Sequence, residues 1–502
     1  MSNSSFASQT QVVFLAAQLA ELAAKQANIN AMIDLGWLVL TGSIVFFMQL
    51  GFALCEAGSM RSKNTAAVLL KNVIDFCVGA ILWYFFGYAF AYGKSENPNN
   101  FIGDARFALK DAPTAEYATW FFQFTFCATA ATIVSGAVGE RIKFTAYLVY
   151  TCFITGFIYP VVLHAAWSDV GWISPFNPGT TRKVGDPMHG VIDFAGSGVV
   201  HLVGGIAALV GCISVGPRRG RFDEKTGEPK NMPGHSATLS CIGTLILFFA
   251  WYSFNCGSTL KLSGNGGELA ARAAMTTTIA GCLAGVSGLL VSAIASRFTV
   301  WDISVTLNSI IFGLVAVTAG CTVFDPWGAF IVGTLSGPLY FGFSTLLLKL
   351  KIDDPTDASA IHGGGGIFGL LFPGFLAMPK PIMESYAFEP RYAGVFCGGS
   401  GIQLGYQLLF LVFVICWSGA LTGLLFFVIT KTIGVRVSPA DEDRGMDVHH
   451  TSHGFAYDYL EMQAPTGSPK YGDPPAQPPV ELPVQPHQPN VEMSAFPGAT
   501  NQ

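Results

Sequence analysis

Long apolar runs constrain the fold of this chain more than any other feature. A helix of about 20 apolar residues crosses the hydrocarbon core of a bilayer, and only helices and closed barrels satisfy all backbone polar groups there. The runs therefore predict an all-α polytopic membrane protein with eleven transmembrane helices. The predicted spans are residues 35–58, 70–93, 117–138, 144–166, 192–215, 236–257, 270–295, 302–322, 327–350, 358–377 and 403–432.

Composition supports the membrane assignment. Hydrophobic residues make up 51% of the 502 residues, charged residues only 12%, and 57 residues are Gly, which is typical of a polytopic membrane protein rather than a globular enzyme. The net charge of -5 gives no indication of a nucleic-acid partner. The cysteines form no CxxC pair, so we expect no zinc site, disulfide framework or other cofactor.

Basic residues predict the orientation and the domain boundaries. Arg61 follows the first span, Arg141 follows the third, and the basic segment 216–230 follows the fifth. Because cytoplasmic loops are enriched in Lys and Arg, we expect the N-terminus outside the cell and the C-terminus inside. The predicted regions are an extracellular N-terminal segment (1–34) with a helix near 8–26, a membrane domain (35–432), a cytoplasmic regulatory tail (433–460) and a disordered Pro-rich tail (461–502).

A short repeat relates the fifth and tenth spans. Asp193 precedes His201 by eight residues, and Asp354 precedes His362 by the same number. Glycines and an isoleucine follow both histidines. This spacing favours an inverted five-plus-five repeat with an extra C-terminal helix.

The two histidines of this repeat lie inside predicted spans, away from their ends. Ionisable groups at membrane depth usually face a transport pathway, and a neutral imidazole offers one donor and one acceptor nitrogen. His201 and His362 are therefore candidates for the lining of a pore. Two other readings remain open: interhelical hydrogen bonds without a substrate, and ligation of a haem by one histidine from each half.

Several motifs carry a resemblance to a known family. They include "GAVGERIKF" at 136–144, "DFAGSGVVH" at 193–201, "WYSFNCGS" at 251–258 and "DDPTDASAIHG" at 353–363. With these motifs the chain resembles the ammonium transporter (Amt/Mep/Rh) family over residues 35–458, and most closely its plant and algal branch. The resemblance implies a homotrimer in the plasma membrane that is not an enzyme, with one pore in each protomer that moves ammonium into the cell.

The resemblance also implies a substrate-recruitment site at the outer mouth of the pore. Trp167 and Ser258 match the residues that capture the cation, and Trp251 matches an aromatic residue of the same vestibule. Asp193 matches an acidic residue near this site. From its position at the start of the fifth span we expect it mainly to cap the helix, and Trp167 can also be read as an interfacial anchor.

Deeper in the pore, the resemblance implies a gate and a twin-histidine motif. Phe126 and Phe254 match two stacked phenylalanines that close the pore, and His201 and His362 match its paired histidines. The alternative for the two phenylalanines is ordinary packing between helices.

The tail carries a candidate regulatory site. Plant relatives have a regulatory threonine between "GMD" and "HGFAY", and Thr451 is the nearest candidate here. A phosphate would add nearly two negative charges, so the resemblance implies a regulatory kinase as a partner. An ammonium sensor (transceptor) that signals through its tail is a further alternative.

Overall fold

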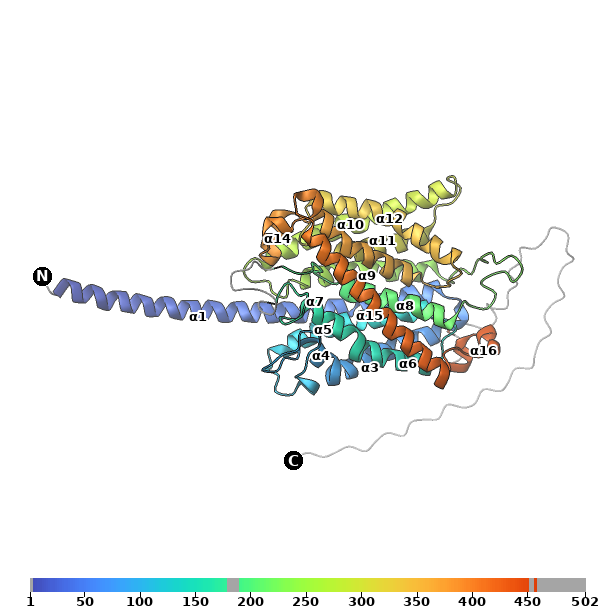
Figure 1. The fold of residues 1–502 in the computed structure, drawn as a ribbon, viewed down its shortest axis with the longest axis horizontal. Coiled ribbons are helices and arrows are strands. Elements are labelled where there is room, and N and C mark those ends of the chain that lie inside the picture. The colour runs from blue at the N-terminus through green and yellow to red at the C-terminus, as the bar shows by residue number, and fades with distance from the viewer. Residues whose placement is uncertain (1–2, 178–188, 451–455, 458–502) are drawn as a thin grey trace, which may run out of the picture.

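A computed structural model describes residues 3–177, 189–450 and 456–457 of the chain. The described residues form a bundle of helices without a β-strand, as predicted. Helix α1 projects from one end of the bundle and α16 lies at the other (Figure 1). The helices of the first half are α1 (Asn3–Phe46), α2 (Met48–Ser59), α3 (Thr65–Leu82), α4 (Tyr88–Tyr92), α5 (Glu116–Ala137), α6 (Phe144–Phe153), α7 (Tyr159–Trp167) and α8 (Val203–Val215).

The second half repeats this helical construction and ends in the tail. Its helices are α9 (Ala237–Gly257), α10 (Gly266–Ala295), α11 (Ile303–Thr318), α12 (Pro326–Lys349), α13 (Gly365–Leu376), α14 (Pro379–Tyr386), α15 (Ile402–Thr432), α16 (Pro439–Arg444) and α17 (Met446–His450). Short 3₁₀ turns are η1 (Ser62–Asn64), η3 (Phe107–Leu109), η7 (Pro390–Tyr392) and η8 (Val395–Cys397). Wider π-helical turns are η2 (Trp83–Gly87), η4 (Ile154–Ile158), η5 (Ser197–Leu202) and η6 (Ser359–Gly364).

The predicted spans are found as helices. Ten helical segments among the described residues are long and apolar enough to cross a membrane, and α11 is a shorter apolar helix of 16 residues. At about 1.5 Å per residue, α11 covers less than the thickness of the hydrocarbon core. The Asp302 side chain caps it by accepting a hydrogen bond from the Val305 N–H, and α11 packs against both α10 and α12, which also pack on each other.

The two halves present their histidines in the same local structure. Each histidine lies in a π-helical turn, His201 in η5 and His362 in η6. Asp193 Oδ2 accepts hydrogen bonds from two backbone N–H groups at the start of η5, and Asp354 Oδ2 accepts one from the Ser359 N–H at the start of η6. This shared geometry is that of the repeat predicted from the Asp-to-His spacing.

The two His-bearing segments approach each other very closely. A Cβ atom added at Gly205 would lie 2.1 Å from the Gly363 backbone nitrogen. Since no side chain fits in that space, the glycines that follow His201 allow the imidazoles of the two halves to meet.

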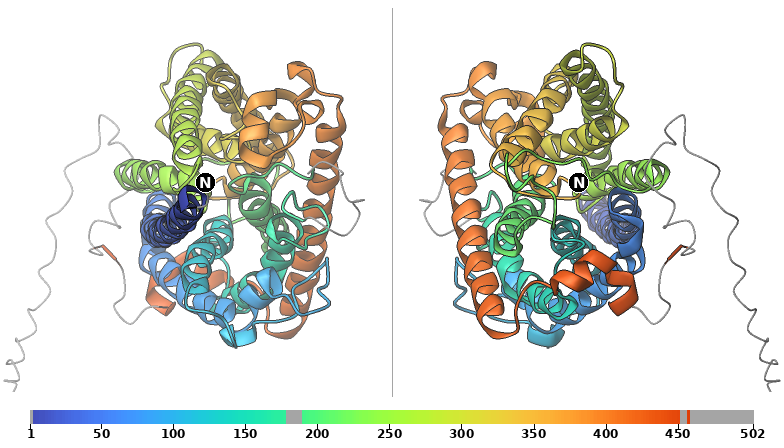
Figure 2. Two further views of the ribbon diagram at one scale, coloured as in Figure 1. Left: turned by 90° about the vertical axis from the view of Figure 1, so that its left-hand side faces the viewer. Right: turned by 90° about the vertical axis from the view of Figure 1, so that its right-hand side faces the viewer.

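The start of the tail docks on the bundle at the end opposite the α1 projection (Figure 2). The Asp447 carboxylate accepts hydrogen bonds from the backbone N–H groups of Ala66 and Ala67 at the start of α3. Glu442 pairs with Arg436 at 2.8 Å and accepts a hydrogen bond from the Arg219 N–H. We call this end of the bundle the tail face.

A buried ion-pair network underlies the docked tail. The Arg218 guanidinium binds Asp353 at 2.8 Å and Glu140 at 3.0 Å. Burial alone would raise the pKa of the Asp353 carboxyl, but the hydrogen bonds and charge of Arg218 hold it well below its ordinary value. The pair therefore stays ionised at neutral pH and holds the loop after α8 against the loop before η6.

Candidate functional site

A cavity of about 160 Å³, the outer cavity, lies where α4, α7 and α9 end and α5 begins. Two of the predicted recruitment residues, Trp167 and Ser258, line it. Trp167 donates its indole N–H to the Asp193 carbonyl at 2.8 Å, and Ser258 donates its hydroxyl to the Phe254 carbonyl at 2.8 Å. The serine oxygen is thereby left as an acceptor. The cavity is lined by Tyr92, Thr119, Gln123, Phe126, Trp167, Phe176, Phe194, Ser258 and Leu260.

Two stacked phenylalanine rings lie at the bottom of this outer cavity. The Phe126 and Phe254 centroids are 4.0 Å apart with planes inclined by 22°, and neither ring is more than 1% exposed. The Trp167 ring meets Phe126 edge-on at 6.0 Å. The structure thus brings together the two residues predicted to form a gate, directly beside the recruitment residues.

The two histidines meet next to the phenylalanine pair. The Nδ1 atoms of His201 and His362 are 3.2 Å apart, and the His201 ring lies 5.3 Å from that of Phe254. In this hydrogen bond one Nδ1 donates and the other accepts, so the pair shares one proton. Within the described residues, His201 Nε2 has no hydrogen-bond partner, which leaves it available to a small polar molecule.

Direct contact between the imidazoles argues against the haem alternative. Axial ligation requires an iron and its macrocycle between the two imidazole rings, and ring centroids 5.3 Å apart with the Nδ1 atoms in direct contact leave no room for them. Among the described residues, no group of three or more His, Cys, Asp or Glu side chains is arranged to hold a metal ion.

Trp251 lies deeper than expected. Its ring stacks on His201 at 4.9 Å, its indole N–H donates to Thr318 Oγ1 at 2.9 Å, and it does not line the outer cavity. The structure places Trp251 beside the histidine pair and not in the wall of the outer cavity. The physical reason is helical rise: Trp251 precedes Ser258 by seven residues on α9, which is about 10 Å along the axis.

The Asp193 carboxyl is buried, and its geometry is that of a helix cap. Oδ2 accepts hydrogen bonds from the N–H groups of Gly198 at 3.0 Å and Val199 at 2.8 Å. Its backbone carbonyl holds the Trp167 indole. Asp193 therefore positions both the start of η5 and the aromatic wall of the cavity, while its own side chain does not line the cavity.

A second cavity, of about 40 Å³, lies on the tail-face side of the histidine pair, and we call it the inner cavity. His362 lines it together with Glu56, a buried carboxyl group that was not among the site residues predicted from the sequence. The signal that points to Glu56 is the presence of Lys71 and Asp75 in the next span, because buried charges in neighbouring spans are rare unless they interact. Thr451 lies outside the described residues.

The site is thus a series of four elements through the bundle: the outer cavity, the phenylalanine pair, the histidine pair and the inner cavity. Moving an ion of ammonium size from water into such an apolar constriction has an idealised desolvation energy of order 20 kcal/mol.

Comparisons with known proteins agree on one family. A sequence profile of the Ammonium Transporter Family matches residues 36–457. The chain is 42% identical over 457 residues to ammonium transporter 1 member 3 of Solanum lycopersicum, covering 88% of this chain and 96% of that one. It is 44% identical over 419 residues to ammonium transporter 1 member 1 of Arabidopsis thaliana, covering 81% of each.

Solved structures show the same architecture. A protein described as a sensor Amt protein superimposes with a TM-score of 0.73 at 33% identity, covering 84% of this chain and 99% of the other. Mep2 of Saccharomyces cerevisiae superimposes with a TM-score of 0.71 at 24% identity over 82% of this chain and 87% of that chain, which indicates the shared fold. The chain therefore belongs to the ammonium transporter family, a family of membrane transporters and not of enzymes.

Proposed function

We propose that this ammonium transporter moves ammonium through a pore formed by the four elements described above. The ion is captured in the outer cavity and gives its proton to water there; ammonia passes the phenylalanine pair, and the proton moves from that water to His201 and on through its hydrogen bond to His362. The observation that carries the proposal is the hydrogen bond between two buried imidazoles, aligned behind stacked aromatic rings.

The outer cavity supports capture of a small cation. The face of an indole attracts a cation by about 0.5 to 2 kcal/mol, and the Ser258 oxygen is available to accept an N–H bond because its own proton is donated to Phe254. Together, Trp167 and Ser258 replace part of the hydration shell that the ion loses on entry.

The phenylalanine and histidine pairs support discrimination against potassium. Potassium is similar in size to ammonium, but it neither donates hydrogen bonds nor releases a proton. The Phe126 and Phe254 rings exclude water, and the histidines accept only species with N–H groups or a proton.

Replacing Trp167 with leucine is expected to raise the half-saturating ammonium concentration about three- to tenfold, since a cation–π contact is lost. Trp167→Phe keeps an aromatic face and is expected to raise it less. The measurement is concentration-dependent current in cells that express equal amounts of surface protein. Trp417→Leu is the control, because Trp417 bonds Ile158 away from the cavity. Equal half-saturation in W167L and wild type would contradict the capture role.

Growth of a transporter-deficient yeast on low ammonium tests the function as a whole. The full chain is expected to restore growth, and a chain without residues 433–502 shows whether the tail is required. Failure of the full chain to restore growth, with the protein demonstrated at the cell surface, would rule out transport as its main function.

A sensor function is the second candidate, because a solved structure with 33% identity is described as a sensor Amt protein and the tail is docked on the bundle. The two functions differ in flux. A transporter passes ammonium in vesicles that contain no other protein, whereas a sensor without transport activity does not.

The segment of α1 from Val12 to Ile33 supports assembly into a homotrimer. Its apolar residues recur at alternating steps of three and four, the spacing of a coiled-coil seam, and they project beyond the bundle (Figure 1). Gln26 occupies one position of this seam, where a polar residue sets the register. The exposed fractions are 64% for Val12, 53% for Leu15, 67% for Leu19, 62% for Leu22, 52% for Ile29 and 44% for Ile33.

Deleting residues 1–30 is therefore expected to weaken the trimer while leaving the bundle folded. In detergent, the truncated protein is expected to become monomeric at a temperature at which the full chain is still trimeric, as measured by light scattering coupled to size-exclusion chromatography. Gln26→Leu makes the seam fully apolar and is expected to strengthen association. The same dissociation temperature for the full and truncated chains would refute a role of α1 in assembly.

The proposed location is the plasma membrane, with α1 outside the cell and the tail face in the cytoplasm. The basic segment 216–230 lies on the tail face, where Arg218 and Arg219 contact the network and the docked tail, and the positive-inside rule assigns such a face to the cytoplasm. With the C-terminus in the cytoplasm, a kinase there is the proposed partner for Thr451, which lies outside the described residues.

A further inference from the structure

The inner cavity contains oxygen atoms suited to a cation, although its walls are mainly apolar. Four oxygen-bearing side chains line it. The Ser59 hydroxyl is paired with the Ser240 hydroxyl at 3.4 Å, and the other three come from three segments: Glu56 from α2, Asn308 from α11 and Thr356 from the loop before η6. Its volume of about 40 Å³ exceeds the roughly 10 to 15 Å³ that one water molecule needs. The cavity is lined by Phe52, Cys55, Glu56, Ser59, Ile133, Leu247, Asn308, Ile311, Thr356, Ala358, Ile361 and His362.

Glu56 is held so that one of its oxygens remains free. The side chain belongs to a residue only 4% exposed, and Oε2 accepts hydrogen bonds from Asn72 Nδ2 at 3.0 Å and Ser135 Oγ at 2.9 Å. Both bonds reach the same oxygen, so Oε1 is left as an acceptor. A carboxylate fixed in this way beside a cavity in a membrane protein marks a pathway more often than a purely structural contact.

The other two polar side chains are oriented as acceptors. Asn308 donates through Nδ2 to the Tyr340 hydroxyl at 2.8 Å, and this hydroxyl in turn donates to Asp357 at 2.6 Å. The amide oxygen of Asn308 is therefore the atom left for the cavity. Thr356 donates its hydroxyl proton to Asp354 Oδ1 at 3.2 Å, so its oxygen also remains an acceptor.

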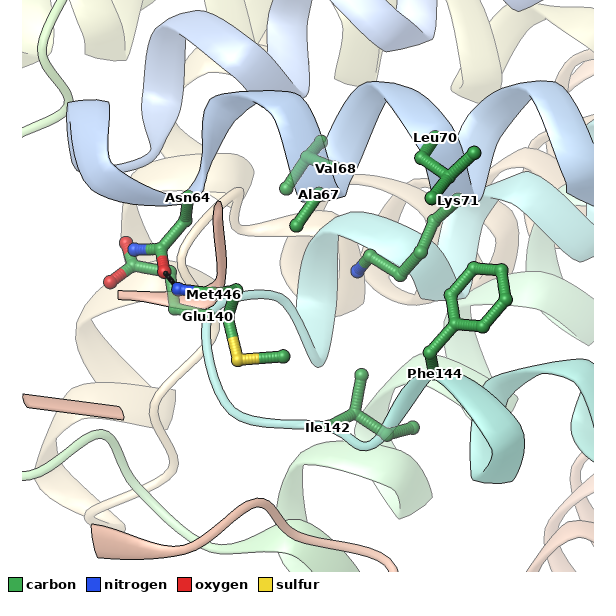
Figure 3. A pocket seen from close by; sticks show the side chains of 9 residues that line it. All are labelled: Asn64, Ala67, Val68, Leu70, Lys71, Glu140, Ile142, Phe144 and Met446. Carbon is green, nitrogen blue, oxygen red and sulfur yellow. Dashed lines mark hydrogen bonds between the residues drawn. The ribbon is translucent and has the colours of Figure 1, made fainter. Parts of the chain in front are cut away.

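The nearest buried cation does not occupy the cavity. Lys71 donates through Nζ to the Ser135 carbonyl at 3.2 Å, and its side chain lines a separate small cavity beside Glu140 and Met446 (Figure 3). The Lys71 side chain interacts electrostatically with Glu56 but lines a different cavity from the one that Glu56 lines.

We propose that the inner cavity is a second ammonium-binding site, in which Glu56 binds the ion on the tail-face side of the histidine pair. Ammonia that has passed the histidines takes up a proton and is held there as ammonium by the carboxylate, the Asn308 amide oxygen and the Thr356 hydroxyl oxygen before release. In flow from the tail face, the same site captures the ion first. This inference rests on the proposed transport function and extends it to the exit.

A site on one side of the histidine pair affects the half-saturating ammonium concentration differently for flow from the two faces. The test measures this difference. Ammonium chloride is applied to one face at a time in purified proteoliposomes that are separated by the accessibility of a C-terminal tag. Glu56→Gln is expected to raise the half-saturating concentration about tenfold for flow from the tail face, because a charge-assisted hydrogen bond is lost. For flow from the opposite face the expected change is less than about twofold.

Two further variants separate binding from folding. The double variant Glu56→Gln with Lys71→Met removes the counter-charge and is expected to show the same asymmetry as E56Q. Asp75→Asn neutralises a buried carboxyl that bonds Thr151 and Thr132 but does not line the cavity, and it is expected to show none.

The outcomes are distinct. Unchanged half-saturation in E56Q, or an equal rise from both faces, would overturn the inner site while leaving transport intact. A potassium current that equals the ammonium current in wild type, and that falls only from the tail face in E56Q, would overturn ammonium as the ligand. Absence of any ammonium current in wild type would instead refute the proposed function itself.

Discussion

Replacing His201 with alanine is expected to lower ammonium-driven current about a hundredfold, at the lower end of what a positioned acid–base group contributes. His201 shares a hydrogen-bonded proton with His362, and its Nε2 atom has no partner among the described residues. Alanine removes both nitrogens, so the proton has no path beside the ammonia molecule. His362→Ala is expected to have the same effect. The measurement is current at saturating ammonium with equal surface protein.

A matched control exists for this prediction. His164 is also a fully buried imidazole, but its nitrogens contact the backbone carbonyls of Ala91 and Asn99, outside the pore. His164→Gln is expected to retain most of the current per folded molecule. If H201A conducts as well as H164Q, the paired histidines do not relay the proton.

Replacing Asp193 with alanine is expected to destabilise the protein by about 3 kcal/mol, because two backbone N–H groups lose their acceptor in a buried place and each such loss costs about 1 to 3 kcal/mol. The Gly198 and Val199 amides are the groups affected. Thermal unfolding in detergent measures the loss. Asp193→Asn keeps a side-chain oxygen and is expected to lose less.

A more exposed helix cap serves as the comparison for this prediction. Asp302 caps α11 through a single bond to Val305 at 3.1 Å, and D302A is expected to lose about 1 kcal/mol, as is usual for such caps. Equal destabilisation by D193A and D302A would show that the carboxyl of Asp193 is not the buried cap that the hydrogen bonds indicate.

The fold was largely predictable because membrane crossing sets helix length directly. The runs predicted at 144–166 and 403–432 correspond to helical segments Phe144–Trp167 and Ile402–Thr432. The repeat was predictable from two Asp-to-His spacings, since a helix start and a pore residue eight positions later must keep their separation in both halves. The sequence did not predict that α1 is continuous over Asn3–Phe46, because an apolar run alone does not define where a helix begins in water.

The sequence predicted which residues belong to the pore better than it predicted how deep along the pore each residue lies. Trp251, Phe254 and Ser258 are close in sequence, yet the helix places them at successive levels, so Trp251 packs on His201 and Ser258 lies in the outer cavity. Glu56 was missed for a different reason. Its significance depends on Asn72 and Ser135, which come from two other helices, and no periodicity in one segment reveals such contacts.

The central claim is that this chain alone conducts ammonium and discriminates against potassium. Purified protein in proteoliposomes, adsorbed on a supported membrane and given equal pulses of ammonium chloride and potassium chloride, tests it most directly. We expect a current with ammonium that H201A lowers about a hundredfold, and no current with potassium. No response to ammonium, or an equal response to both ions, would contradict it.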